Sequence, residues 1–261
     1  MSETGKCTGC GLCAKVCGKA ITLENGRPVF DLSKCNACGH CVGVCPNDAI
    51  DHPRSPRQEL VGKILTPDEA ARFLRTARSV RFYKEKSIDH MTMEKLLDIG
   101  RYAQTGSNSQ GISYIVVDGR EKVVKMLDLF CDIYESAAPN DPSLAWLEPA
   151  VTNYRKSGKD GILRGAPQVI LALADKGDHR GPRNAQFDLT FIALLAPSMG
   201  LGTCWAGIFE RLICDGKYDA PFRKMLNIPD NLAVQGAMMV GYPDVTFRRL
   251  VARNDLNLTW F

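Results

Sequence analysis

The sequence predicts an α+β fold, in which a mixed sheet flanked by helices follows a small cysteine-rich domain. Three observations support this prediction. Eight of the eleven cysteines lie within the first 45 residues. Residues 53–65, which follow them, are rich in proline and charge and have the composition of a linker. Beyond the linker, helical patterns alternate with short apolar runs, as expected for helices packed on a sheet.

The eight N-terminal cysteines form two copies of the spacing CxxCxxCxxxC, which begin at Cys7 and Cys35. A cubane [4Fe-4S] cluster needs four thiolates around a small volume, and a CxxCxxC turn supplies three of them. In two-cluster ferredoxins, the last cysteine of each run binds the other cluster. The spacing therefore predicts two clusters and a protein that transfers electrons. The expected ligand sets are Cys7, Cys10, Cys13 and Cys45 for one cluster, and Cys35, Cys38, Cys41 and Cys17 for the other.

The two cysteine runs belong to an internal repeat. Ala20-Ile21 follows the first run, and Ala49-Ile50 follows the second. Between the runs, residues 21–30 flank Asn25-Gly26, a dipeptide that favours the tight turn of a hairpin. We therefore expect a small hairpin there.

Zinc and disulfide bonds are the competing interpretations of these cysteines. Zinc sites usually take paired CxxC units with longer spacers, whereas four cysteines here fall within eleven residues. A disulfide framework would suit a small secreted protein, but no signal peptide precedes Cys7. We therefore expect a cytoplasmic protein with reduced thiols. His40 adjoins Cys41, and a solvent-facing loop histidine is the simpler interpretation of it.

Composition and missing motifs exclude several classes of protein. The chain has 261 residues, of which 45% are hydrophobic and 24% charged, as in globular proteins. Its net charge of +4 is small and scattered, so we expect no nucleic-acid partner. The longest apolar run, residues 187–199, is too short to span a bilayer, so we expect no membrane partner. Phosphate-loop, dinucleotide and HExxH motifs are absent, which leaves the chemistry to cofactors.

The predicted domains are a two-cluster domain at 1–52, a linker at 53–65 and a larger domain at 66–261. The larger domain starts with a capping box, in which Thr66 is the N-cap and Glu69 its partner. Further helical spacing occurs at 93–102, 123–134, 184–199 and 218–226. Strands are expected at 114–117, 169–174 and 232–240. The helix from Asn184 is apolar nearly all round, which suggests a central or subunit-interface position.

Four segments carry the informative chemistry of the larger domain. They are residues 77–83 (ARSVRFY), 103–110 (AQTGSNSQ), 200–207 (GLGTCWAG), and 241–243 (GYP) with the arginine-rich tail. Together they resemble the nitroreductase superfamily of FMN-dependent oxidoreductases, over about residues 67–261. The resemblance implies a mixed sheet flanked by helices, an FMN cofactor and a homodimer, because the family builds each flavin site from two subunits.

In this family, the first segment holds the phosphate and ribityl chain of the flavin. The resemblance therefore implies that role for Arg78, Ser79 and Arg81. Ala77 replaces the family's first arginine, so neutralisation of the phosphate must depend on Arg81 and on arginines of the tail. The tail positions similar to the family's are Arg253 and Arg249. A solvated surface charge is the alternative interpretation for these arginines.

The second segment resembles a loop that reaches the flavin of the other subunit. The resemblance implies flavin contacts by Thr105, Gly106, Asn108 and Gln110. Gln104 stands where the family usually has proline, and ordinary turn chemistry is the alternative for these polar residues.

The third segment is similar to the family strand that lies behind the isoalloxazine ring. The resemblance implies cofactor contacts by Cys204, Trp205, Ala206 and Gly207. The glycines permit close approach of the backbone, and the amides of Ala206 and Gly207 can face the reactive edge of the flavin. A cysteine inside an apolar strand is more often structural than nucleophilic, so Cys204 is not expected to attack a substrate.

The resulting hypothesis is an iron–sulfur flavoprotein reductase. Two clusters pass electrons to FMN, which reduces a small organic acceptor such as a nitroaromatic, a quinone or an activated alkene. An external low-potential donor such as a ferredoxin is the expected electron source, in place of NAD(P)H. The alternative is a redox carrier or sensor that passes electrons to a protein partner and has no small-molecule substrate. No side chain is assigned as the proton donor.

Overall fold

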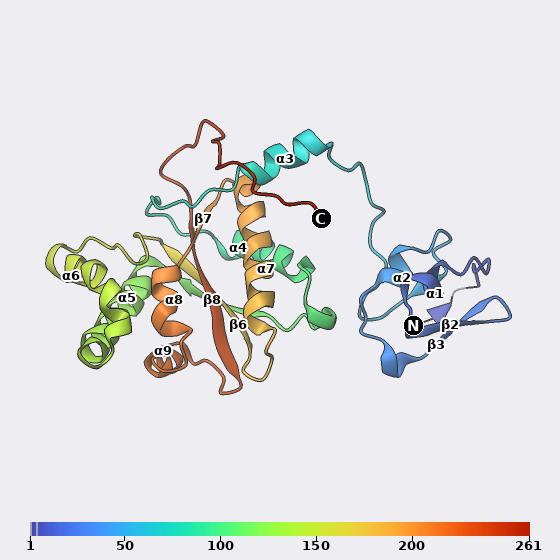
Figure 1. Cartoon of the computed structure of the whole chain (residues 1–261), viewed down its shortest axis with the longest axis horizontal. Helices are drawn as coiled ribbons and strands as arrows, with labels where there is room; N and C mark the ends of the chain where they lie inside the picture. The colour runs from blue at the N-terminus through green and yellow to red at the C-terminus, as the bar shows by residue number, and fades with distance from the viewer. Residues whose placement is uncertain (1, 4) are drawn as a thin grey trace. The chain divides into compact units, whose positions relative to one another are not determined.

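The computed structural model describes residues 2–3 and 5–261, which form two compact units (Figure 1). The first unit comprises the described residues up to Leu65 together with Gly106–Ser109. The second comprises Thr66–Thr105 and Gln110–Phe261. Among the described helices, none is both long and apolar enough to cross a bilayer.

Two strand pairs build the sheet structure of the first unit. β2 (Ile21–Glu24) and β3 (Arg27–Phe30) form an antiparallel hairpin. Its turn residues, Asn25 and Gly26, have φ angles of 48° and 75°, a left-handed conformation that both residue types tolerate. The predicted hairpin is therefore confirmed. The second pair joins β1 (Ser2–Glu3) to β4 (Ile50–Asp51), again antiparallel.

Two short helices complete the first unit and repeat each other. α1 (Leu12–Val16) follows Gly11, and α2 (His40–Gly43) follows Gly39. The two glycines have φ angles of 76° and 75°, which residues other than glycine rarely adopt. The core of the unit likewise takes equivalent residues from both halves of the repeat. It contains Cys13 and Cys41 from the helices, and Ile21 and Ile50 from the strands.

The second unit is built on a four-stranded sheet with the order β5-β6-β8-β7. Its strands are β5 (Ser113–Asp118), β6 (Gln168–Asp175), β8 (Leu232–Gly241) and β7 (Gly202–Trp205). Each neighbouring pair is antiparallel. A parallel bridge from Ser79 to Thr203 adds a further segment beyond β7 and makes the sheet mixed. The three strands expected from short apolar runs are confirmed as β5, β6 and β8.

Helices cover both faces of this sheet (Figure 1). One face packs on α5 (Arg120–Ala137), α6 (Glu148–Ser157), α8 (Gly207–Ile213) and α9 (Ala220–Leu226). The other packs on α4 (His90–Asp98) and α7 (Gly181–Leu195). Successive residues of a strand face opposite sides, so Val169 and Leu171 enter the first core while Ile170 and Ala172 enter the second.

A cluster of three phenylalanine rings fixes α8, the helix that begins directly after β7. Phe209 of α8 lies 5.7 Å from the ring of Phe130 in α5 and 5.3 Å from that of Phe222 in α9. All three side chains are fully buried. Removal of one such ring typically costs about 3–5 kcal/mol. The start of α8 is therefore held firmly against the sheet.

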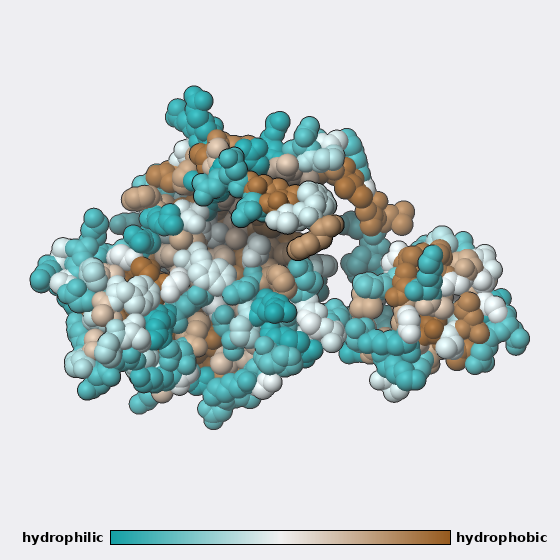
Figure 2. All heavy atoms as spheres, in the orientation of Figure 1, coloured by the Kyte–Doolittle hydropathy of each residue, from teal (hydrophilic) through white to brown (hydrophobic). Residues whose placement is uncertain are grey.

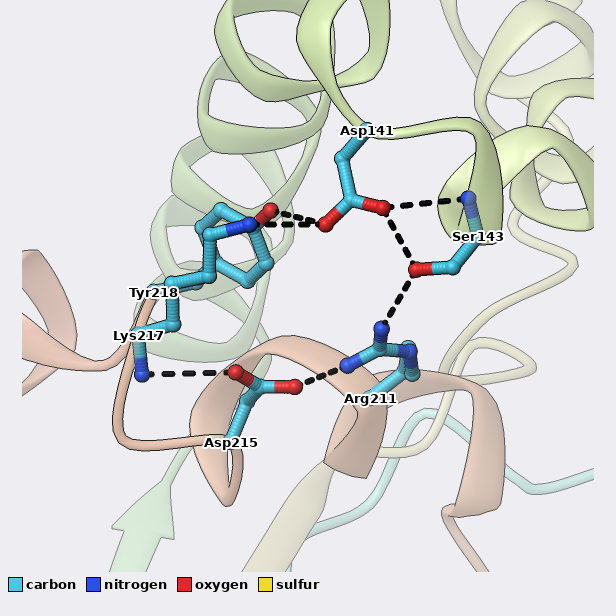
Figure 3. Close-up of polar contacts among 6 residues, drawn as sticks. All are labelled: Asp141, Ser143, Arg211, Asp215, Lys217 and Tyr218. Carbon is cyan, nitrogen blue, oxygen red and sulfur yellow. Dashed lines mark hydrogen bonds and ion pairs between the residues drawn. The ribbon is translucent and has the colours of Figure 1, made fainter.

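A polar network holds the far end of α8 (Figure 3). Asp141 accepts hydrogen bonds from the amide and hydroxyl of Ser143, from the Tyr218 hydroxyl and from Lys217 Nζ. Arg211 of α8 donates to Ser143 Oγ at 2.9 Å. The hydrogen bonds that Ser143, Tyr218 and Lys217 donate hold the pKa of the Asp141 carboxyl well below its usual range. The carboxylate thus ties the connection between α8 and α9 to the turn after α5.

The second unit opens with α3 (Pro67–Arg75). Thr66 Oγ1 accepts from the Glu69 amide at 3.3 Å, and Glu69 Oε2 accepts from the Thr66 amide at 2.8 Å. The predicted capping box is therefore confirmed. No residue of α3 is buried. Apolar side chains are also exposed in the segment before α3, where Leu60 and Val61 are 88% and 86% accessible. In Figure 2, hydrophobic residues on the surface are brown.

Candidate cofactor sites

The structure gathers the eight N-terminal cysteines into two quartets within the first unit, each around its own pocket. One pocket is lined by Cys7, Cys10, Cys13 and Cys45. The other is lined by Cys35, Cys38, Cys41 and Cys17. Each quartet thus takes three cysteines from one run and the fourth from the other run, the crossed arrangement that the spacing predicts.

Backbone amides point at sulfur atoms in both quartets. Gly9 N lies 3.4 Å from Cys7 Sγ, and Ala37 N lies 3.4 Å from Cys35 Sγ, at equivalent positions of the repeat. Ala49 N lies 3.2 Å from Cys45 Sγ. Such donors stabilise the negative charge of a metal-bound thiolate.

This donor set fits two cubane clusters. Burial raises the pKa of the Cys13 and Cys41 thiols, because water solvates the buried thiolates poorly. A bound metal would stabilise these thiolates in place of water. Within the described part of the chain, no group of three or more His, Cys, Asp or Glu side chains is placed to hold a single metal ion. The sulfurs surround pockets instead, as the ligands of a cluster do.

Two histidines lie close to these cysteines in different environments. His40 is exposed, as predicted, although it opens α2 and is not in a loop. His52 is only 5% accessible and lines the second pocket. Burial lowers the pKa of His52. His52 was not singled out from the sequence, although its position two residues after Ile50 places it next to the repeat.

In the second unit, the first and third predicted segments lie side by side. Ser79 forms a bridge with Thr203 of β7, and Val80 N donates to Thr203 O at 2.9 Å. Gly202 makes this approach possible, because a Cβ atom there would lie 2.5 Å from Val80 Cγ2. The segment 77–81 therefore runs along the edge of the sheet next to β7.

Two adjoining hollows flank this segment and share Arg78 and Thr203. The first, of about 240 Å³, is lined by Ala77, Arg78, Ser79, Thr190, Ala193, Leu194, Thr203, Cys204, Trp205 and Met238. The second, of about 370 Å³, is lined by Thr76, Arg78, Val80, Pro197, Gly200, Leu201, Gly202, Thr203, Pro243, Val245, Thr246 and Phe247. The guanidinium of Arg78 lies over the Phe247 ring at 5.5 Å. The larger hollow falls in the range of roughly 300–1,000 Å³ that is typical of small-molecule sites.

Glu210 of α8 positions the indole of Trp205. Trp205 Nε1 donates to Glu210 Oε2 at 2.6 Å, and Ala237 N of β8 donates to Glu210 Oε1 at 2.7 Å. Burial raises the pKa of Glu210. Gly236 lies beside the pair, because a Cβ atom there would be 3.5 Å from Trp205 Cη2 and 3.6 Å from Glu210 Oε1. Sequence reasoning missed Glu210, whose only local signal is its place three residues after Gly207.

Several predicted flavin residues do not line either hollow. Ala206 N donates to Ala237 O of β8 at 2.9 Å, so this amide is already hydrogen-bonded to the sheet. Gly207 opens α8, where first-turn amides lack partners within the helix. Arg81, Arg249 and Arg253 are exposed. Of the residues predicted from the first and third segments, Arg78, Ser79, Cys204 and Trp205 line the first hollow.

The second predicted segment forms a tight loop. Ser107, Asn108 and Gln110 have φ angles of 56°, 54° and 48°, which are uncommon for residues other than glycine. Gln110 N donates to Thr105 Oγ1 at 3.1 Å. Gly106 and Asn108 belong to the first compact unit, where Asn108 Nδ2 donates to the carbonyls of Asn36 and Ala37 at 3.0 and 3.1 Å.

Known proteins resemble both parts of the chain. Residues 74–242 match the model of the nitroreductase family, and residues 1–46 match that of the 4Fe-4S dicluster domain. A protein of Archaeoglobus fulgidus, named as a candidate NADH dehydrogenase/NAD(P)H nitroreductase, is 25% identical over 67% of this chain and 86% of its own length.

The fold is similar to that of solved nitroreductases with bound FMN. The Bacteroides fragilis protein has 20% identity and a TM-score of 0.58, over 74% of this chain and 99% of its own. The Desulfitobacterium hafniense protein has 20% identity and a TM-score of 0.57, over 73% of this chain and 97% of its own. The family model spans well over half of the chain. The chain therefore belongs to the nitroreductase family and carries an N-terminal 4Fe-4S dicluster domain.

Proposed function

We propose that this protein is an iron–sulfur flavoprotein reductase that passes electrons from two [4Fe-4S] clusters to FMN and then to a small organic acceptor. The observation that carries the proposal is the presence of two crossed cysteine quartets in a nitroreductase-family chain. In this proposal the cluster domain spans residues 1–52, the linker 53–65 and the FMN domain 66–261.

The hollows beside β7 are the proposed FMN site. When bound, FMN supplies two-electron transfer to an acceptor, and the clusters supply single-electron transfers. Arg78 would pair with the phosphate, because its guanidinium offers a fork of donors and borders both hollows. Cys204 and Met238 give the hollow an apolar wall, and Glu210 holds the Trp205 indole in a fixed orientation.

A homodimer is part of the proposal. The tail and α3 expose apolar side chains that a second copy could cover, among them Leu256 and Trp260, which are 84% and 86% accessible. Light scattering of the FMN-loaded protein should give twice the mass of one chain. A monomer with one FMN per chain would contradict the two-subunit site.

The proposed electron source is an external low-potential donor such as a ferredoxin. The test compares wild type with a double variant, Cys10→Ser plus Cys38→Ser, which removes one ligand from each quartet. Under anaerobic conditions, a reduced bacterial-type ferredoxin should bleach the flavin absorbance of wild type and not that of the variant. Cys214→Ser, which changes a cysteine outside both quartets, is the matched control and should behave as wild type.

NADH and NADPH supply the opposite arm of this experiment. If either nucleotide reduces the flavin equally fast in wild type and in the double variant, the relay through the clusters is wrong. Metal and flavin analysis of the same samples should find two four-iron clusters and bound FMN in wild type.

The acceptor class is tested by turnover. Anaerobic protein with a low-potential donor should reduce nitroaromatics, quinones or activated alkenes faster than free FMN does. If no compound of the three classes is turned over beyond free FMN, the alternative of a carrier or sensor with a protein partner is favoured.

A further inference from the structure

The imidazole of His52 lies against a cysteine of the second quartet. Its Nε2 is 3.6 Å from Cys35 Sγ, and the residue is 5% accessible. A hydrogen bond to sulfur is longer than one to oxygen, because sulfur is the larger atom. The ring and the thiol are therefore close enough for an N–H···S interaction.

The other ring nitrogen determines which partner donates. The backbone amide of Arg54 donates to His52 Nδ1 at 3.1 Å. A backbone N–H can only donate, so Nδ1 holds a lone pair and the ring proton is on Nε2. Nε2–H therefore points at Cys35 Sγ, and the sulfur accepts.

The chain around His52 holds the ring in place. Asp51 Oδ1 accepts from the amides of His52 at 2.9 Å and Arg57 at 3.3 Å. The amide of Ser55 donates to His52 O at 3.0 Å, and its hydroxyl donates to Ala37 O beside the Cys35 turn. This compact turn keeps the imidazole against the sulfur with little rotational freedom.

The internal repeat supplies a built-in comparison. Ala49-Ile50 corresponds to Ala20-Ile21, so His52 corresponds to Leu23. Leu23 lines the first pocket, and His52 lines the second. The backbone donors Gly9 and Ala37 are equivalent in the two halves, with the same 3.4 Å distance to sulfur. At this position the second half of the repeat has an N–H donor, whereas the first half has an apolar side chain.

We propose that His52 donates a hydrogen bond to Cys35 Sγ and thereby raises the reduction potential of the cluster held by the second quartet. This inference rests on the proposed cluster binding. Reduction adds one electron from the external donor, and no bond forms or breaks, while His52 keeps its proton. The added negative charge spreads onto the thiolate sulfurs, so a donor at one of them favours the reduced state.

The test is a potentiometric titration of the whole, anaerobically reconstituted chain, followed by electron paramagnetic resonance (EPR). His52→Leu makes the second half-site resemble the first. The measurement is made at the potential that half-reduces the second cluster of wild type. There, the reduced-to-oxidised ratio of the same cluster in His52→Leu should be about tenfold lower, equivalent to a decrease of ~59 mV in a one-electron potential. His52→Gln, whose amide N–H lies near the place of Nε2, should recover most of this loss. His40→Leu removes the exposed histidine and should change neither cluster.

The outcomes separate this inference from the proposed function. If wild type binds no four-iron clusters, the proposed function fails. If both clusters are loaded and His52→Leu titrates as wild type does, only the role of His52 fails. A second measurement does not depend on folding of the variants. Pulsed EPR of wild type containing isotope-labelled histidine should detect nitrogen coupling to one reduced cluster, and the absence of that coupling would overturn the inference.

Discussion

Asp188 of α7 offers a sharp test of the packing of the second unit. Its carboxyl is 3% accessible and lies in the core between α7 and the sheet. Tyr114 donates to Oδ2 at 3.0 Å, and among the described residues Oδ1 has no hydrogen-bond partner. A buried carboxylate with one unsatisfied oxygen disfavours its own ionisation. Burial accordingly raises the pKa of Asp188 from 3.8 to about 6.

The sign of the pH effect follows from this shift. The folded state holds the proton more tightly than the unfolded state. Asp188 therefore lowers the free energy of unfolding very little below about pH 4 and most strongly above pH 6. The full penalty is ~3 kcal/mol at pH 8, and roughly half of it is present at pH 5. Between pH 5 and pH 8, wild type should therefore lose about 1.4 kcal/mol of unfolding free energy through this group.

The perturbation is Asp188→Asn, which removes the charge and keeps an acceptor for the Tyr114 hydroxyl. Urea unfolding at pH 5 and pH 8 can be followed by tryptophan fluorescence, because Trp146, Trp205 and Trp260 all lie in the second unit. The advantage of Asp188→Asn over wild type should be larger at pH 8 by about 1.4 kcal/mol. Asp230→Asn, which alters an exposed carboxyl, is the control. An equal pH dependence in wild type and Asp188→Asn would refute the reasoning.

Three further predictions concern the proposed flavin site. Glu210→Ala leaves the buried Ala237 amide unpaired and should lower the free energy of unfolding by about 1–3 kcal/mol. Glu210→Gln keeps one acceptor and should lose less; equal losses in urea unfolding would contradict the pairing. Gly202→Ala puts a methyl group 2.5 Å from Val80 Cγ2 and should cost about 1–3 kcal/mol in thermal unfolding, whereas Gly207→Ala meets only a 3.5 Å contact and should cost less. Arg78→Ala should weaken FMN binding about 10- to 100-fold in equilibrium dialysis, and an unchanged affinity would remove Arg78 from the site.

Features whose contacts are local in sequence were predicted well. The turn at Asn25-Gly26, which pairs Glu24 with Arg27, and the capping box of Thr66 and Glu69 each depend on residues at most three positions apart. Their conformations follow from turn and capping chemistry alone. β6 and β8 were predicted because their continuous apolar runs are buried on both faces of the sheet. β5 is only partly buried, and its β-branched run identified it.

Features that depend on distant residues escaped prediction. Glu210 acquires its role from Ala237, which is 27 positions away, and His52 from Cys35, which is 17 positions away. α6 and α8 were also missed. Tertiary packing, such as the contacts of Phe209 with Phe130 and Phe222, stabilises α8 where local signals are weak.

The charge of the proposed flavin site connects cofactor binding to assembly. Among the described residues that line the two hollows, Arg78 is the one charged side chain. A phosphate monoester carries a charge of about −1.5 to −2, so a single arginine leaves part of it unpaired. Ala77 occupies the position where the family has an arginine, and Arg249 and Arg253 lie in the exposed tail. In the proposed site, Arg81, an arginine of the tail or a second copy of the chain would supply the remaining positive charge. If the second copy supplies it, the dimer binds FMN more tightly than the monomer does, so FMN binding and dimer formation should strengthen each other.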